Sequence, residues 1–213
     1  MPDLHFQVED AFATPNAAVP QLSFRVRITN SEPEPVHSIG MRVQVQIEPV
    51  RRRYTAEEQE RLKELFGEPE RWSKSVHPLL WTNANVNVGA FTGSTVIEVP
   101  VPCTFDFNIA VTKYIHGLEG GELPMSFLFS GMVFHAGRMG LQIAQIPWDR
   151  EAAYKLPVRV WKEMMDLHYP NTAWLCLERD VFDRLAEYKA RNNIASWEQA
   201  LERALGLAAE AKA

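Results

Sequence analysis

The sequence has few cysteines and no long apolar run. Among its 213 residues only Cys103 and Cys176 carry thiols, and two distant thiols are typical of reduced cysteines in a cytoplasmic protein. Residues 1–10 lack the basic start and apolar stretch of a signal peptide. No run of about 18 apolar residues occurs, so we expect no membrane span. These absences together predict a cytoplasmic protein without disulfides.

The sequence also lacks an excess of positive charge. Its net charge is −5, and binding to nucleic-acid phosphates depends on clustered Lys and Arg, so we expect no nucleic-acid partner. Hydrophobic residues make up 46% of the chain, which is ordinary for a globular protein. The length allows one large domain, or one domain with an appendage, that buries a core without disulfides.

Motifs of catalysis and of cofactor binding are absent. The chain has no glycine-rich nucleotide loop followed by Lys and Ser or Thr, no G-x-G-x-x-G, no G-x-S-x-G, no H-E-x-x-H and no C-x-x-C. The glycines of 89–93 and 117–121 are typical of turns. We therefore assign no catalytic residue, metal or cofactor from motifs, and an enzyme is not indicated.

Two runs, 22–29 and 41–48, alternate strictly between apolar and polar residues. Successive side chains of a strand point to opposite faces, so each run has one dry and one wet face, as in antiparallel sheets with a solvated side. Asn, Ser and two prolines in 30–38 end the first strand and form a loop. The two runs therefore predict paired antiparallel strands.

Similar patterns predict further strands. Phe6 and Val8 begin a first strand, residues 79–101 hold at least one, and 123–134 form an apolar, central one. Two more have specific core candidates: Phe105, Phe107, Ile109 and Val111 in 104–115, and Leu141, Ile143 and Ile146 after residue 139. Seven to nine strands by residue 147 predict a mainly β, antiparallel two-sheet sandwich, Ig-like or related, over residues 1–150.

One helix interrupts these strands. Thr55 and Glu58 have the spacing of a capping box, and Leu62, Leu65 and Phe66 form a narrow apolar stripe. The other face is nearly all charged, so we expect helix 55–66 at the surface over a sheet edge.

Residues 151–213 are predicted to form a helical segment packed on the sandwich. A helix starts at Pro157 and has apolar positions at Val158, Trp161, Met164, Met165 and Leu167. Asp180 caps the next helix and Ser196, with Gln199, caps the last one. The short connection between these two predicts an αα-hairpin. Residues 174–180 are predicted to be a last extended segment.

Cys103 and His135 are weak candidates for a reactive pair. If the turn at 117–122 closed a hairpin, these two residues would face each other across it, and a thiolate beside an imidazole can act as a nucleophile or metal ligand. The alternative interpretation is a buried, inert cysteine near a strand-end histidine.

Arginines and tryptophans are the candidates for binding a protein partner. Arg51, Arg52 and Arg53 could dock an acidic partner, or form a solvated strand end that pairs with the glutamates of 57–70. All six tryptophans fall outside the clear alternating strands, where they could cement helices onto the sandwich. Trp81 and Trp148 could instead anchor a partner, and Trp81 with the asparagines of 82–87 could bind a sugar.

Residues 22–54 and 156–205 resemble an uncharacterised bacterial protein family that is often encoded beside uptake nickel–iron hydrogenase genes. The resemblance covers most of the chain, and it implies an accessory, assembly or partner-binding role near a metalloenzyme without assigning any site residue. The main hypothesis is thus a non-catalytic accessory or scaffolding protein that binds a protein partner. Homo-oligomer formation is compatible with this hypothesis. The alternatives are a metal-handling protein or enzyme using Cys103 and His135, and a carbohydrate-binding module.

Overall fold

A computed structural model describes residues 2–104, 108–137, 140–172, 175 and 177–210, with the backbone alone for 207–210. The chain divides into two compact units, Met1–Asn171 and Thr172–Ala213, which are called here the sandwich and the helix pair. The predicted boundary at residue 150 is therefore too early, because the sandwich continues through one more strand and one more helix. The predicted packing of the helical segment on the sandwich stays a prediction.

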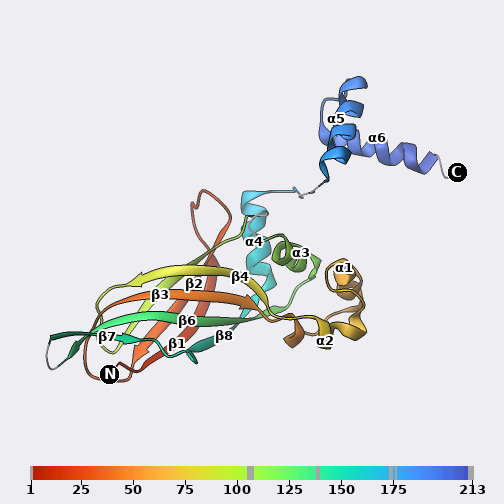
Figure 1. Cartoon of the computed structure of the whole chain (residues 1–213). Coiled ribbons are helices and arrows are strands. Elements are labelled where there is room, and N and C mark those ends of the chain that lie inside the picture. Colours follow the sequence, from red (N-terminus) through yellow and green to blue (C-terminus); the bar gives the residue numbers. More distant parts are fainter. Residues whose placement is uncertain (1, 105–107, 138–139, 173–174, 176, 211–213) are drawn as a thin grey trace. The chain divides into compact units, whose positions relative to one another are not determined.

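The sandwich contains two antiparallel sheets, as the sequence predicts (Figure 1). The three-stranded sheet has the order β1-β2-β5, and the five-stranded sheet has the order β4-β3-β6-β7, with β8 also paired to β6. The strands are β1 Leu4–Ala13, β2 Gln21–Asn30, β3 Val36–Ile47, β4 Leu79–Val88, β5 Ser94–Pro102, β6 Glu122–Gly137, β7 Gly140–Gln145 and β8 Glu151–Pro157. The alternating runs in β2 and β3 are confirmed as strands with one buried face.

Aromatic rings join the two sheets. Phe24 of β2 lies edge-on to Phe127 of β6, with ring centroids 5.0 Å apart, and Phe6 of β1 stacks on Phe129 at 4.1 Å. Such pairs add to the hydrophobic burial of the rings themselves. The side of the five-stranded sheet that meets the three-stranded sheet is called its inner face, and the opposite side its outer face.

Four α-helices belong to the sandwich unit, and two short 3-10 turns accompany them among its described residues. They are α1 Ala56–Phe66, α2 Trp72–Ser75, α3 Ile109–Gly117 and α4 Val158–His168, with turns η1 Pro49–Arg51 and η2 Pro69–Arg71. The capping box of α1 is confirmed, since Thr55 Oγ accepts from Glu58 N and Glu58 Oε2 accepts from Thr55 N. Helix α1 contacts α3, and α4 contacts β1, β2 and β8. None of the described helices is long and apolar enough to cross a membrane.

The predicted strand over 104–115 is wrong in its second half, where Ile109–Gly117 forms α3. The side chain of Asn108 caps the helix by accepting from Val111 N at 3.0 Å. Val111, Tyr114 and Ile115 then point into the core at helical spacing, which overrides their β-branched or aromatic character. Phe105 and Phe107 lie outside the described residues.

Two core assignments at other elements are also corrected. Leu141 and Ile143 of β7 are exposed, whereas Ile146 is buried as predicted. Leu167 of α4 is exposed, although the other four predicted positions of that helix are buried. Both errors have one cause: periodicity identifies residues that share a face but does not say whether another layer covers it.

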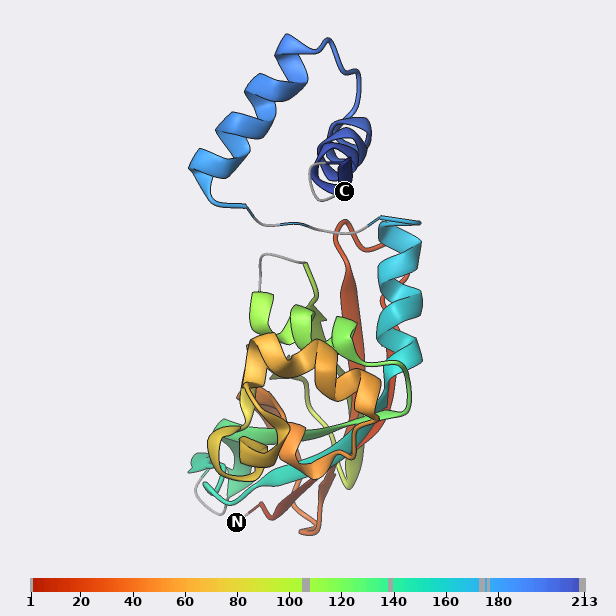
Figure 2. The ribbon, with the colours of Figure 1, turned by 90° about the vertical axis from the view of Figure 1, so that its right-hand side faces the viewer.

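The helix pair consists of α5 Arg179–Arg191 and α6 Trp197–Glu210. Glu178, not Asp180, precedes α5 as its cap, while Ser196 Oγ accepts from Gln199 N at 3.2 Å as predicted. The helices touch through Phe182 and Trp197, whose ring centroids are 5.3 Å apart. Figures 1 and 2 show the two helices running in different directions, so the predicted αα-hairpin does not have antiparallel helices. The predicted extended segment includes Trp174 and Cys176, which lie outside the described residues.

Candidate functional site

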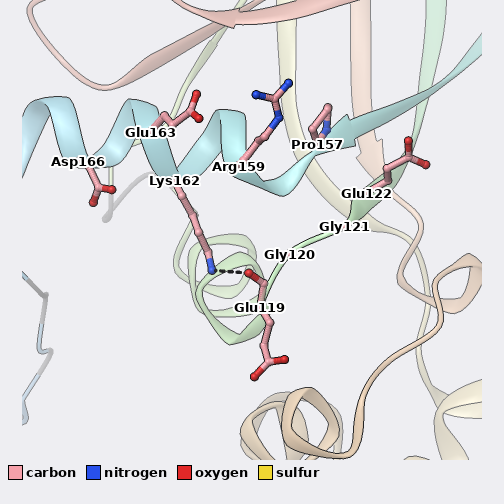
Figure 3. A pocket seen from close by; sticks show the side chains of 9 residues that line it. All are labelled: Glu119, Gly120, Gly121, Glu122, Pro157, Arg159, Lys162, Glu163 and Asp166. Atoms are coloured by element: carbon pink, nitrogen blue, oxygen red, sulfur yellow. Dashed lines mark hydrogen bonds between the residues drawn. The ribbon is translucent and has the colours of Figure 1, made fainter.

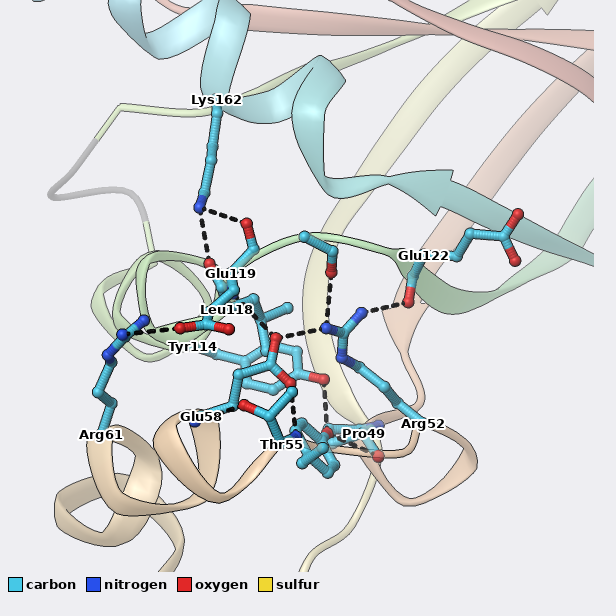
Figure 4. A network of polar contacts seen from close by, with 12 residues as sticks. Pro49, Arg52, Thr55, Glu58, Arg61, Tyr114, Leu118, Glu119, Glu122 and Lys162 are labelled. Atoms are coloured by element: carbon cyan, nitrogen blue, oxygen red, sulfur yellow. Dashed lines mark hydrogen bonds and ion pairs between the residues drawn. The ribbon is translucent and has the colours of Figure 1, made fainter.

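A buried ion pair fixes the loop that leads from α3 into β6 (Figure 4). Arg52 Nη2 lies 2.6 Å from Glu58 Oε1, and both side chains are more than nine-tenths buried. The guanidinium also donates to the carbonyl oxygens of Gly120 and Glu122, at 2.6 and 2.7 Å. Lys162 of α4 donates to the carbonyls at the start of the same loop. Charges from three elements therefore hold residues 118–122 in place.

The carboxylate of Glu58 is stabilised in its charged form. Burial alone would raise its pKa, but hydrogen bonds from the backbone amides of Glu119 and Thr55 and the ion pair with Arg52 outweigh burial and lower it. Beside this pair, the Tyr54 hydroxyl donates a hydrogen bond to Pro49 O. Because its one hydrogen is used there, the Tyr114 hydroxyl is the donor in the 2.7 Å hydrogen bond between the two tyrosines. Burial raises the pKa of Tyr54 to about 12. The network is thus a fixed structural support at neutral pH.

Two surface pockets share Gly121 and Glu122 of this loop. The pocket beside α4, of about 510 Å³, has charges of both signs (Figure 3). Its cations are Arg159 and Lys162, and the Lys162 ammonium is already bound by backbone carbonyls. Its acidic lining residues are Glu119, Glu122, Glu163 and Asp166. Because cations and carboxylates are mixed, the pocket favours neither an anionic nor a cationic ligand.

The second pocket, of about 410 Å³, is basic. Its lining residues are Arg51, Arg52, Arg53, Gly121, Glu122, Pro124 and Lys155. Among the described residues, Arg51 and Lys155 make only long contacts with acidic groups, at 4.0 Å to Glu48 and 3.5 Å to Glu122 respectively. The structure thus brings two of the predicted arginines, Arg51 and Arg53, to the surface beside a lysine that sequence reasoning missed. It places Arg52 beneath them as part of the buried network, so Arg52 is not a partner-binding residue.

At the other end of the sheet, the outer face carries an apolar patch, defined as Met132, Phe134, Leu141 and Ile143. Leu141 is paired with Ala136 and Ile143 with Phe134, so all four side chains project to the same side of β6 and β7. Leu141 and Ile143 are each 63% exposed and Met132 is 49% exposed. Strand β7 has β6 as its only paired neighbour among the described strands and contains no charged residue. A clustered apolar surface on a free strand edge is typical of an interaction site.

Trp148 lies in the connection that follows this edge strand. The residue is 93% exposed. The connection itself is fixed, because Ile146 N donates to Gly131 O at 3.0 Å and Arg150 O accepts from Phe129 N at 2.9 Å. An exposed indole on an anchored backbone fits the partner-binding role predicted for Trp148.

The other tryptophans have different environments. Trp81, predicted as a partner or sugar platform, lies within β4 and is buried, with its ring edge-on to Phe24, so it cannot stack on a ligand. Trp81 is thus a strand residue, although it lies outside the two runs with clear alternation. Trp72 and Trp161 pack helices into the core, which confirms the cementing interpretation for these two. No periodic pattern distinguishes buried Trp81 from exposed Trp148.

The sequence analysis predicts that Cys103 and His135 would face each other, and the structure does not bring them together. Helix α3 replaces the hairpin that would have paired them. Cys103 follows β5 and donates its backbone N–H to Pro20 O, whereas His135 lies in β6, paired with Val36 and Gln142. Burial raises the pKa of the Cys103 thiol to about 12, which makes it an inert thiol at neutral pH. Among the described residues no three His, Cys, Asp or Glu side chains gather closely enough to hold a metal ion.

Several solved structures resemble this chain distantly. The CARDB domain of the PF1109 protein from Pyrococcus furiosus, solved with di-metal ions, is 12% identical over 73% of this chain and 92% of its own, with a TM-score of 0.30. A putative late embryogenesis abundant protein is 13% identical over 74% of this chain and 72% of its own, with a TM-score of 0.33. The putative ApaA protein from Bordetella pertussis is 13% identical over 73% of this chain and 93% of its own, with a TM-score of 0.25. Likenesses at this level carry no function to this chain.

The search against curated protein sequences found no match. A protein-family model matches residues 1–213, which is the full length of the sequence. The chain therefore belongs to the family described as a family of unknown function, DUF6084.

Proposed function

We propose that this protein is a non-catalytic accessory or scaffolding protein that binds a partner protein through the outer face of its five-stranded sheet. The observation that carries the proposal is the apolar patch on β6 and on the edge strand β7. Leu141 and Ile143 project from an uncharged strand whose outward backbone groups have no neighbouring strand among the described residues. An extended partner segment can add to such an edge, so that backbone hydrogen bonds give affinity and the patch gives specificity.

Trp148, in the connection that follows β7, offers a second exposed contact for the same partner. Exposed aromatic side chains on fixed backbone are frequent anchors in protein interfaces. The resemblance to a family encoded beside uptake nickel–iron hydrogenase genes makes the subunits and assembly proteins of such an enzyme the first partners to test. We place the encounter in the cytoplasm, on the cysteine usage of the sequence.

The test is co-purification of the tagged full chain from cells of its source, with the bound proteins identified by mass spectrometry. The double variant Leu141→Lys, Ile143→Lys places charges on the patch, and we expect it to lose the partner. Val96→Lys is the matched control, because Val96 is also an exposed apolar strand residue but lies in the three-stranded sheet. A partner retained equally by the wild type and both variants would contradict the proposal, and so would a wild-type chain that purifies alone.

A further inference from the structure

We propose that the basic pocket, lined by Arg51, Arg53 and Lys155, binds an acidic segment of the partner protein. The inference rests on the proposed function, because it names the chemistry of the partner at the opposite end of the same face. Pro124 and Lys155, both pocket residues, are cross-strand neighbours on β6 and β8 and project to the outer face. The pocket and the apolar patch are therefore parts of one surface.

Charge complementarity favours an acidic ligand. Arg53 has no hydrogen bond or ion pair within the described part of the chain, and Arg51 and Lys155 have only the long contacts given above. Against these three cations the pocket has a single carboxylate, that of Glu122. The whole chain has a net charge of −5, so an acidic segment gains no attraction from the overall charge and is attracted by the local excess of cations in this pocket.

The wall of the pocket is fixed before any ligand binds. The backbone of Arg52 is extended, and its side chain turns inward to bind the carbonyls of Gly120 and Glu122. Glu58 and Lys162 hold the same loop from two helices, as Figure 4 shows. A ligand must therefore order only the side chains of the exposed cations, which lowers the entropy lost on binding.

The separation of the two sites suits an extended peptide. Pro124 and Met132 lie eight residues apart on β6, and at about 3.3 Å per residue they are about 26 Å apart. A partner segment of about eight residues that lies along the outer face could place apolar side chains on the patch and carboxylates in the pocket.

The experiment measures binding of a fluorescein-labelled hexaglutamate peptide to the full chain by fluorescence anisotropy. We expect binding at low salt that weakens at least tenfold in Arg53→Glu. Lys74→Glu is the matched control, because it makes the same charge change at an exposed lysine outside the pocket, and we expect it to bind like the wild type. Circular dichroism of both variants checks that they fold.

Equal weakening in Arg53→Glu and Lys74→Glu would overturn the inference, because attraction would then be general. Tighter binding of hexathymidylate or of inorganic phosphate, with the same sensitivity to Arg53→Glu, would also overturn it in favour of a phosphate site. The outcome is separable from that of the proposed function. The Leu141→Lys, Ile143→Lys variant is expected to keep binding hexaglutamate, so peptide binding without a co-purified partner would leave the pocket standing and reject the partner-binding face.

Discussion

The two faces of the five-stranded sheet both carry large apolar side chains, but these side chains have different neighbours. On the inner face, Phe127 and Phe129 are buried beneath the three-stranded sheet. On the outer face, Leu141 and Ile143 remain in solvent. Only apolar surface that leaves water on folding stabilises the fold, so the outer residues contribute little to it and remain available for a partner. The comparison predicts that the effect of a substitution on stability follows burial rather than hydrophobicity.

The largest effect is expected at the centre of the inner face. Phe127→Ala removes a fully buried ring that touches Phe24, and we expect it to lower the free energy of unfolding by about 4 kcal/mol. Chemical denaturation followed by circular dichroism measures the change. A loss below about 1 kcal/mol would show that the two sheets are not tightly packed at this point.

A slightly smaller effect is expected in the buried polar network. Glu58→Gln leaves the buried guanidinium of Arg52 without its counter-charge, so we expect a loss of about 3 kcal/mol at neutral pH. An Arg52→Met, Glu58→Leu double variant, which removes both charges, should be more stable than Glu58→Gln alone.

The same carboxylate predicts a pH dependence. The pKa of Glu58 is lower in the folded protein than its usual value of 4.5, so its contribution is fully present above pH 4.5. The contribution is lost as the pH falls from there through the folded-state pKa. Denaturation at several pH values between 3 and 7 should show that the free energy of unfolding depends less on pH in Glu58→Gln than in the wild type. An identical pH dependence would contradict the lowered pKa of Glu58.

The next effect is at the exposed start of α1. Thr55→Ala removes the hydroxyl that accepts from Glu58 N at 3.1 Å, and we expect a loss of about 1 kcal/mol. Thr55→Ser keeps the hydroxyl and serves as the control. Equal loss in both variants would mean that the cap is not the cause.

The smallest effect is expected on the outer face. Ile143→Thr replaces an apolar side chain in the same sheet as Phe127, but it should change the free energy of unfolding by no more than about 0.5 kcal/mol, because the side chain is already in water. A loss close to that of Phe127→Ala would remove the contrast between the two faces.

Much of the fold could be predicted from local pattern. The alternation in β2 and β3 and the capping box of α1 both depend on residues close together in sequence, and both are confirmed. Helix α3 could not be predicted in the same way, because the β-branched residues Ile109, Val111 and Ile115 favour strands. Tertiary packing and the Asn108 cap stabilise the helix instead. The missed helix also removed the hairpin on which the Cys103–His135 pairing depended.

The candidate site was harder to predict than the fold, because it depends on which side chains another layer covers. Trp148, Arg51 and Arg53, which the sequence analysis names as partner-binding candidates, reach the surface. Arg52 and Trp81 have the same chemistry as Arg51, Arg53 and Trp148 but are buried against residues distant in sequence, such as Gly120 and Phe24. Leu141 and Ile143 were mistaken for core for the converse reason, since β7 has the alternation of a buried strand, yet both residues are exposed within the described part of the chain.

The anchored connection that carries Trp148 also fixes the length of the chain at that point. Strands β7 and β8 pair with different parts of the same edge of β6, so residues 146–150 must span a constant interval between them. One inserted residue would move Glu151 and Lys155 into the buried places of Ala152 and Leu156, since a shift of one position turns a strand over. The pairing of β8 therefore depends on the number of residues in this connection and not on the exposed side chain at position 148, and a change in that number has to be compensated before β8 begins.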